Sequence, residues 1–342
     1  MKIVKSLFAG MKKARPLRPV KPVIETLEGI LLGSPETTAG APHFVDHIEI
    51  KRYMSMVIVA MIPTTVAAVV FFGWYVLAMI LCSYVVGGII EVLFALIRKK
   101  EIEEGFLVTG LIFPLVLPPT TPLWVVAVGI AFGVFFGKEV FGGTGRNIFN
   151  PALVGRIFIT IAFPEIMSAT WRVPFSDAIS AATPLAVYRS TQGAAPYLDL
   201  LLGQVAGSVG EVFRIGIIVG ALLLMVTRVS SWRITLSYLA SVALFAFVGH
   251  SLGPQTFAPP LFQLLSGGLL FGAVFMATDP VTSPATKPGK FIFGSLCGII
   301  TVLIRTFSGF TEGVMFSIVF MNAFTPLIDN TIVNLKYRPA KR

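Results

Sequence analysis

The sequence predicts an all-α polytopic membrane protein with about ten transmembrane helices. Of its 342 residues, 55% are hydrophobic and only 13% are charged, and the mean hydropathy is +0.84. A soluble domain of this length carries nearer a quarter charged residues. Several apolar runs approach or exceed the roughly 20 residues that a helix needs to cross a bilayer. Because lipid cannot satisfy free backbone groups, these runs must form helices, some of them broken inside the bundle.

Ten apolar segments make up the predicted spans. They lie at about 54–72, 75–97, 105–117, 123–141, 150–163, 209–227, 233–250, 259–277, 291–306 and 313–331. The third and the fifth are short, which indicates tilted or broken helices. An even number of spans puts both ends of the chain on the same side of the membrane.

The net charge of +10 is distributed as in a membrane protein with a fixed orientation. Nine of the 27 Lys and Arg residues precede Met54, and four more follow Asn334. Four connections on the opposite side contain no Lys or Arg, at 73–74, 118–122, 251–258 and 307–312. By the positive-inside rule both termini are cytoplasmic and the long 164–208 segment is external. This placement of charge argues against binding to nucleic acid.

The long external segment divides the spans five and five, which suggests an internal repeat. Gly110-Leu111-Ile112-Phe113 in the third span resembles Gly268-Leu269-Leu270-Phe271 in the eighth, and each leads to a Pro-X-Thr-X-Pro sequence. The two spans point in opposite directions, so the sequence predicts two inverted five-helix repeats. The expected divisions are a basic arm (1–52), the first repeat (53–163), an external loop (164–208), the second repeat (209–331) and a tail (332–342).

The cysteines and the start of the chain exclude several other features. Cys82 and Cys297 lie singly in apolar segments. Two isolated thiols predict neither a disulfide nor a zinc site nor an iron–sulfur cluster. The first residues have only a brief apolar run before Lys12-Lys13, so we expect a soluble basic arm rather than a cleavable signal peptide.

A single hydroxyl stands among small residues at the end of Asp177-Ala178-Ile179-Ser180-Ala181-Ala182-Thr183. The small residues leave space for a large group to reach the Thr183 oxygen, and Asp177 could bind a metal during attachment of that group. A threonine hydroxyl is a poor nucleophile unless another enzyme activates it. The alternative is a loop that caps a short helix from Ala181 onward, with Pro184 early in its first turn. Both interpretations remain open from the residues alone.

A glycine-rich segment, Phe141–Pro151, lies between the fourth and fifth spans. Its glycines, Gly145 among them, allow the backbone to approach a planar ligand, and Asn147 and Asn150 offer amide groups to a polar ring edge. It lacks GxGxxG and a preceding strand, so a Rossmann site is not expected. A tight turn with an Asn helix cap is the alternative.

Ionisable and aromatic residues within the spans are candidates for handling a cation. Carboxylates are costly in lipid and often mark ion pathways; here they are Glu91, Glu139, Asp279 and Asp329. Asp279-Pro280 ends a span at a helix break, where freed carbonyls could join the carboxylate around Na⁺. Phe271 and Phe275, one turn apart, could form an apolar constriction. The alternative is that the acids reach headgroup water and the rings face lipid or core.

At these motifs the chain resembles the B subunit of bacterial Na⁺-translocating NADH:quinone reductases, from about Ile50 to Asn330. The matching blocks are Lys51–Met54, Gly87–Phe94, Glu104–Thr109, Lys138–Asn147 and Met276–Val281. Several blocks in order are more specific than any single motif. The resemblance implies a ten-helix component of a bacterial inner-membrane translocase, which is inactive without five other subunits.

The resemblance also implies cofactors and site residues. It implies FMN joined to Thr183 by a phosphoester, with Asp177 and Ser180 in the same motif and a separate flavin transferase for maturation. It implies riboflavin near Gly145, Asn147 and Asn150. It associates Na⁺ passage with Glu91, Asp279 and Asp329, and a constriction with Phe271 and Phe275. The pair Gly87-Gly88, which otherwise predicts close helix packing, corresponds to a region linked to the quinone.

Two alternative functions remain. The D subunit of the Rnf complex, a ferredoxin:NAD⁺ oxidoreductase that pumps ions, is also similar, through Asp177–Leu185 and Arg305–Phe310. The long arm and the Lys138–Pro151 block favour the reductase, although the chain lacks an insertion that many of the reductase B subunits carry between their first two helices. A passive channel or solute transporter without a redox role is the alternative of another class, and a covalent flavin on Thr183 would distinguish them.

Overall fold

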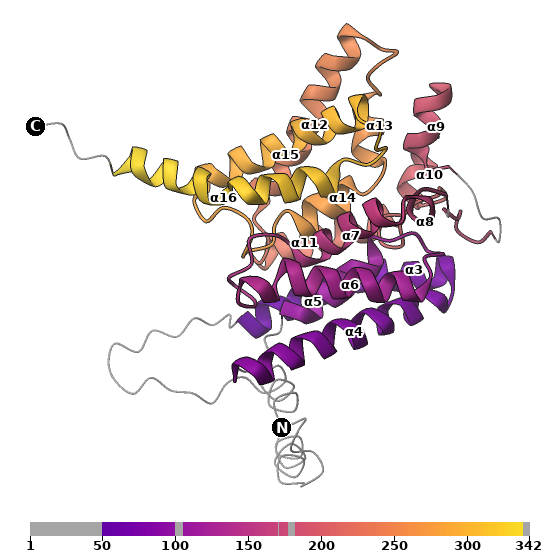
Figure 1. The fold of residues 1–342 in the computed structure, drawn as a ribbon. Coiled ribbons are helices and arrows are strands. Elements are labelled where there is room, and N and C mark those ends of the chain that lie inside the picture. Colours follow the sequence, from indigo (N-terminus) through magenta and orange to yellow (C-terminus); the bar gives the residue numbers. More distant parts are fainter. Residues whose placement is uncertain (1–49, 100–104, 170, 177–181, 338–342) are drawn as a thin grey trace, which may run out of the picture.

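The computed structural model describes residues 50–99, 105–169, 171–176 and 182–337, all of whose regular elements are helical (Figure 1). Residues 1–49 of the predicted basic arm and residues 338–342 of the predicted tail lie outside the described residues. The first part of the chain forms α3 (Ile50–Phe72), α4 (Tyr75–Arg98), α5 (Gly105–Leu115), α6 (Leu123–Gly137), the 3₁₀ turn η2 (Glu139–Phe141) and α7 (Pro151–Ala162). The connecting segment holds α8 (Pro164–Ala169), α9 (Pro184–Thr191) and α10 (Tyr197–Leu202). The second part forms α11 (Arg214–Val226), α12 (Trp232–Leu252), α13 (Pro260–Leu265), α14 (Leu269–Phe271), the π-helical segment η3 (Gly272–Met276), α15 (Lys287–Phe307) and α16 (Val314–Lys336).

Each of the ten predicted spans contains helix, so the all-α prediction is confirmed. Within the described residues, six helices are long and apolar enough to cross a membrane: Tyr53–Phe72, Tyr75–Arg98, Leu123–Phe141, Trp232–Leu252, Lys287–Phe307 and Val314–Lys336. The predicted third, fifth and sixth spans are shorter apolar helices. The sixth starts at Arg214 rather than near 209, because the amides of Val209 and Gly210 donate to the carbonyls of Leu117 and Leu115 instead of entering a helix.

The eighth predicted span, 259–277, is not one continuous helix. It is interrupted after α13, where Ser266 is extended and Gly267 takes a positive φ of 62°. The Glu312 carboxylate accepts the amide of Gly268 at 2.9 Å, and a Cβ at Gly267 would lie 2.0 Å from the same carboxylate. The interruption therefore requires glycine for both conformation and space.

The helix α4 shows how the sequence separates its lipid face from its packed face. Its exposed stripe is purely apolar and repeats every four residues: Leu77, Leu81, Val85, Ile89 and Leu93. Its buried stripe has the same period but includes small, polar and charged residues: Met79, Ser83, Gly87 and Glu91. A soluble protein has the opposite arrangement. The polar groups lie inside because lipid offers them no partner.

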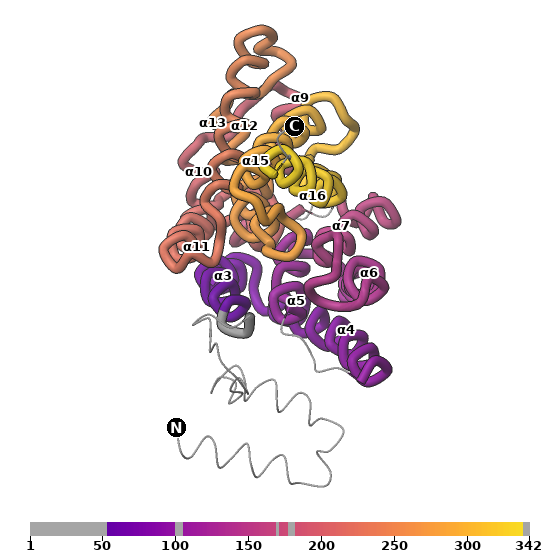
Figure 2. The backbone as a smooth tube through the Cα atoms, turned by 90° about the vertical axis from the view of Figure 1, so that its left-hand side faces the viewer, coloured from indigo at the N-terminus to yellow at the C-terminus, as the bar shows by residue number. Residues whose placement is uncertain are grey.

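The two parts of the chain form neighbouring groups of helices (Figure 2). Packing pairs in the first group recur in the second: α4 packs on α6 as α12 packs on α15, and α6 packs on α7 as α15 packs on α16. The groups meet where α3 crosses α11. Gly220 permits this crossing, because a Cβ there would lie 2.4 Å from the Ala60 carbonyl oxygen and 2.9 Å from the Phe275 ring.

The ends of the helices define two ends of the molecule (Figure 1). We call one of them the basic end, because Arg98, Arg228, Arg233, Lys290 and Lys336 are found there. At this end lie the starts of α3, α5, α7, α12 and α15 and the ends of α4, α6, α11 and α16. The connecting segment with α8, α9 and α10 lies at the other, the loop end.

Replacement of Gly220 by Ala tests the crossing of α3 and α11. A Cβ so close to a backbone oxygen cannot be accommodated by a side-chain shift, so we expect Gly220→Ala to destabilise the fold by about 1–3 kcal/mol. The thermal unfolding midpoint of the detergent-purified protein measures this. Gly309→Ala is the matched control, because nothing lies within 4 Å of a Cβ at that position. Equal midpoints for the two variants would contradict the close crossing.

Candidate functional site

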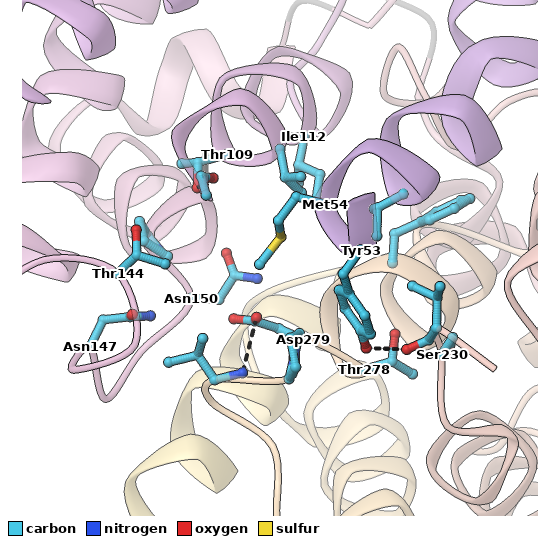
Figure 3. A pocket seen from close by; sticks show the side chains of 18 of the residues that line it. Tyr53, Met54, Thr109, Ile112, Thr144, Asn147, Asn150, Ser230, Thr278 and Asp279 are labelled. Atoms are coloured by element: carbon cyan, nitrogen blue, oxygen red, sulfur yellow. Dashed lines mark hydrogen bonds between the residues drawn. The ribbon is translucent and has the colours of Figure 1, made fainter. Parts of the chain in front are cut away.

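A cavity at the basic end, here called the central cavity, brings together residues that the sequence placed in separate sites (Figure 3). Asn147 and Asn150 line it from the glycine-rich segment, and Phe275 and Asp279 line it from the interrupted eighth segment. Its remaining polar lining comes from residues that the sequence analysis did not single out: Tyr53, Thr109, Lys138, Thr144, Ser230 and Thr278. The volume is about 60 Å³, which is room for an ion and a few water molecules.

The glycine-rich segment folds as a turn that feeds α7. Gly142, Gly143 and Gly145 have φ values of 118°, 99° and 85°. The Gly145 amide donates to Asn147 Oδ1 at 3.2 Å, and Asn147 Nδ2 donates to the Phe149 carbonyl at 3.0 Å. Asn150 Oδ1 accepts the Ala152 amide at 3.1 Å and caps α7. The predicted turn and helix cap are therefore present, and both asparagines also line the cavity.

Asp279 lies three residues after Met276, the last residue of the π-helical segment. Its carboxylate accepts the Val281 amide at 3.3 Å and the Thr282 hydroxyl at 3.0 Å, and it faces the central cavity (Figure 3). In η3 the Ala277 amide bonds to the Gly272 carbonyl at 2.7 Å, five residues back. A π-helical turn inside a helix is rare and often accompanies a functional site.

Phe271 and Phe275 are buried with ring centroids 5.0 Å apart. Phe275 lines the central cavity, whereas the Phe271 ring lies against Gly210 in the segment before α11. The pair thus continues from the cavity toward the loop end. This arrangement suits the apolar constriction that the sequence suggested.

Two of the candidate acids are held in ion pairs. Buried Glu91 of α4 accepts a hydrogen bond from buried Lys138, which follows α6. Glu139 pairs with Arg98 at 2.7 Å. Neither basic partner could be predicted from local sequence, because the two lie 47 and 41 residues away along the chain. Lys138 also lines the central cavity, so its ion pair with Glu91 lies beside that cavity.

Asp329 connects α16 to the loop before α15. Its carboxylate accepts the Ala285 amide at 2.7 Å and the Thr286 amide at 3.1 Å, which ties the loop before α15 to α16. It is not among the described residues that line the central cavity. Gly87 and Gly88 occur at helix contacts, where added Cβ atoms would lie 3.2 Å from Ile130 and 3.4 Å from Phe106.

Asn322 is a buried polar residue that the sequence analysis also missed. It is 1% exposed, and neither its amide oxygen nor its nitrogen has a partner within the described part of the chain. On the same face of α16, Ile318 approaches Gly272 and the Thr325 hydroxyl donates to the Thr282 carbonyl at 3.0 Å. Asn322 therefore faces the segment that carries Asp279. The sequence feature that could have pointed to this residue is an asparagine in the middle of an apolar span.

Thr183 lies at the loop end, as the N-cap of α9, where its hydroxyl oxygen accepts the Ala186 amide at 3.4 Å. The short helix expected from Ala181 onward begins at Pro184, because the ring of proline fits the first helical position. Asp177 and Ser180 lie outside the described residues.

A second cavity, of about 270 Å³, lies beside α9 and is here called the loop-end cavity. Leu185, Tyr188 and Arg189 of α9 line it together with Arg305 of α15. Burial raises the pKa of Tyr188. Burial pushes the pKa of Glu312 up, but the charges of Arg305 and Arg156, together with hydrogen bonds from the Gly268 amide and Arg305, hold that pKa below its usual range.

Comparison with known proteins agrees with the resemblance noted from the motifs. The family described as "NQR2, RnfD, RnfE family" matches residues 37–338. The chain belongs to this family. It is 44% identical to the B subunit of the Na(+)-translocating NADH-quinone reductase of Pseudomonas paraeruginosa, over 78% of this chain and 70% of the relative. The corresponding protein of Chromohalobacter salexigens is 45% identical over 77% of this chain and 67% of the relative. That of Klebsiella pneumoniae is 42% identical over 75% of this chain and 67% of the relative.

The pair of Lys138 and Glu91 yields a test by double substitution. Removal of one partner leaves a buried charge without compensation, so we expect Lys138→Met to destabilise the protein by about 3–5 kcal/mol. Adding Glu91→Gln should restore much of the loss, and exposed Lys287→Met is the control. Thermal unfolding of the native protein, Lys138→Met, Glu91→Gln alone and the double variant measures the coupling. Additive losses would mean that the pair does not act as a unit.

Proposed function

We propose that this chain is the membrane component of a Na⁺-translocating NADH:quinone reductase that passes electrons across the membrane to quinone. One observation carries the proposal. Asn147 and Asn150, which are expected to hold riboflavin, and Asp279, which is expected to bind Na⁺, line the same central cavity at the basic end, whereas Thr183 lies at the loop end. A chain with a redox group at each end, and a cation site beside one of them, could link electron transfer to Na⁺ transport.

Thr183 is the proposed attachment point of FMN through a phosphoester. The side chain stands at the N-terminus of α9, where free amides and the helix dipole favour a phosphate. The loop-end cavity beside it offers Tyr188 and Arg189 to a polar aromatic group. Asp177 and Ser180 belong to the same proposed motif. Maturation would require a flavin transferase, since a threonine hydroxyl needs another enzyme to activate it.

Riboflavin is the proposed ligand at Asn147 and Asn150, with Gly145 giving the turn its shape. Both amides line the central cavity with Thr109 and Thr144, a donor and acceptor set that suits the polar edge of a flavin. The cavity is smaller than a flavin ring system, so the rest of the ligand would lie outside it. Bound flavins would supply one- and two-electron chemistry, and the chain would position them.

Asp279 is the proposed Na⁺ ligand, with the constriction at Phe271 and Phe275 next along the path. A change of charge beside Asp279 would alter its affinity for a cation. Glu91 and Asp329 are proposed to act at the basic end of the same path, and Gly87-Gly88 to lie in the quinone region. For Glu91, Lys138 would compete with any cation.

The proposed orientation puts the basic end in the cytoplasm of a bacterium and the loop end outside the inner membrane. Residues 53–163 and 209–331 are proposed to be inverted repeats, which the recurring packing of α4 on α6 and α12 on α15 supports. Five further subunits would complete the translocase. Quinone reduction by the translocase would distinguish it from an Rnf-type complex, which would exchange electrons with ferredoxin. A purified complex can be assayed for quinone reduction and for electron exchange with ferredoxin.

Replacement of Thr183 by Ala tests the external flavin. We expect the ultraviolet fluorescence of the denatured chain in a gel to disappear, because the ester oxygen is absent. Thr191→Ala, at the other end of α9, is the matched control and should keep the band. A band that survives in Thr183→Ala would place the attachment elsewhere. A complete absence of covalent flavin from the native complex would favour a passive channel.

Replacement of Asp279 by Asn tests the cation site. Loss of the charge should weaken the apparent affinity for Na⁺ at least about tenfold, roughly 1.4 kcal/mol, in Na⁺-stimulated quinone reduction by the complete complex. Asp199→Asn, an acid of α10 at the loop end, is the control. Unchanged Na⁺ dependence in Asp279→Asn would refute the assignment.

A further inference from the structure

A third cavity lies next to the central cavity at the basic end and is here called the basic cavity. It has a volume of about 570 Å³ and shares Tyr53, Val229, Ser230, Thr278 and Pro280 with the central cavity. Three cationic side chains line it, Arg228, Arg233 and Lys290, and no acidic side chain does so among the described residues. A concave surface with three like charges attracts anions.

The backbone of the basic cavity also suits an anion. Trp232 and Arg233 begin α12, a helix of 21 residues, and its N-cap Ser231 makes no side-chain capping bond; all three residues line the cavity. The first amides of a helix and its dipole favour negative charge. At the neighbouring start of α15, by contrast, the Asp329 carboxylate already accepts the amides of Ala285 and Thr286.

Two serine hydroxyls in the lining have no partner in the described part of the chain. Ser230 is 7% exposed and its Oγ makes no hydrogen bond there; Ser231 Oγ, also shielded from solvent, likewise makes none. A buried hydroxyl without a partner costs free energy. An oxyanion in the basic cavity would give both hydroxyls an acceptor.

The position of the basic cavity indicates the source of the anion. The apolar spans Trp232–Leu252 and Lys287–Phe307 both begin at it. Trp232 is half exposed, its ring lies 5.9 Å from that of Phe291, and the Arg233 guanidinium lies 5.0 Å from the indole. Tryptophan at the start of a span marks the level of lipid headgroups. Basic pockets between helices at this level bind anionic headgroups.

We propose that the basic cavity binds the phosphate group of an anionic ligand at the membrane surface. The three cations would balance the charge, and Ser230, Ser231 and the first amides of α12 would donate hydrogen bonds to the phosphate oxygens. A phospholipid phosphodiester and a free phosphate share this chemistry. Neither flavin binding nor ion transport by the chain is required for it.

The test uses the complete complex, delipidated in neutral detergent, and its thermal unfolding midpoint. The probes are dioleoylphosphatidylglycerol, dioleoylphosphatidylcholine and inorganic phosphate. A ligand of the folded state raises the midpoint. We expect phosphatidylglycerol to do so in the native complex, with an affinity at least about tenfold lower in Arg233→Gln/Lys290→Gln. The control Lys287→Gln/Lys336→Gln removes two positive charges at the same end and outside the cavity, and should bind as the native complex does.

The outcomes separate the sources. Stabilisation by inorganic phosphate and not by phosphatidylglycerol assigns the site to free phosphate. No stabilisation of the native complex by either, or equal stabilisation of both double variants, overturns the proposal. If Arg233→Gln/Lys290→Gln fails to fold, a photoactivatable phosphatidylglycerol crosslinked to the native complex replaces it. Labelled peptides should then contain Trp232 or Lys290, and labelling only elsewhere overturns the proposal.

Discussion

The ion pair of Arg305 and Glu312 supports the interruption on which the rest of the arrangement depends. A break within a membrane segment frees backbone groups that lipid cannot satisfy. Glu312 accepts the Gly268 amide, while Arg305 donates to the carbonyls of Gln263 and Ser266 at 2.8 and 3.0 Å. Two side chains from the start of α16 and the end of α15 thus replace the hydrogen bonds that a continuous eighth helix would have made.

The interruption determines what lies at the centre of the bundle. It allows α14 to begin as a separate helix that continues into the π-helical segment. Phe271 and Phe275 then lie next to each other, and Asp279, which follows the segment, faces the central cavity. The same cavity receives Asn147 and Asn150 from the glycine-rich turn. The proposed cation site and the proposed flavin site are therefore neighbours, although 129 positions separate Asn150 from Asp279 in the sequence. Two such sites can interact electrostatically without a conformational change between them, because a charge a few ångströms away acts directly.

The loop end contrasts with this interior. There Thr183 caps a short helix, three of whose side chains line the loop-end cavity, and Arg305 lines that cavity while it also supports the interruption. One buried arginine thus contacts both the loop-end cavity and the broken segment. At the opposite end, cations gather around the start of α12, where no acid lines the cavity among the described residues. The two ends differ in chemistry as well as in position.

The order of residues alone predicts the class of the protein and most of its helices, because hydrophobicity, span length and the distribution of Lys and Arg are local quantities. It also singled out Asn147 and Asn150 in a glycine-rich connection, Phe275 one helical turn after Phe271, and Asp279 at the end of an apolar span. The packing of distant segments establishes that these four residues share a cavity, that Glu91 pairs with Lys138, and that the eighth segment is interrupted. Those facts depend on partners far away along the chain. Local propensity cannot report a hydrogen bond that another helix supplies.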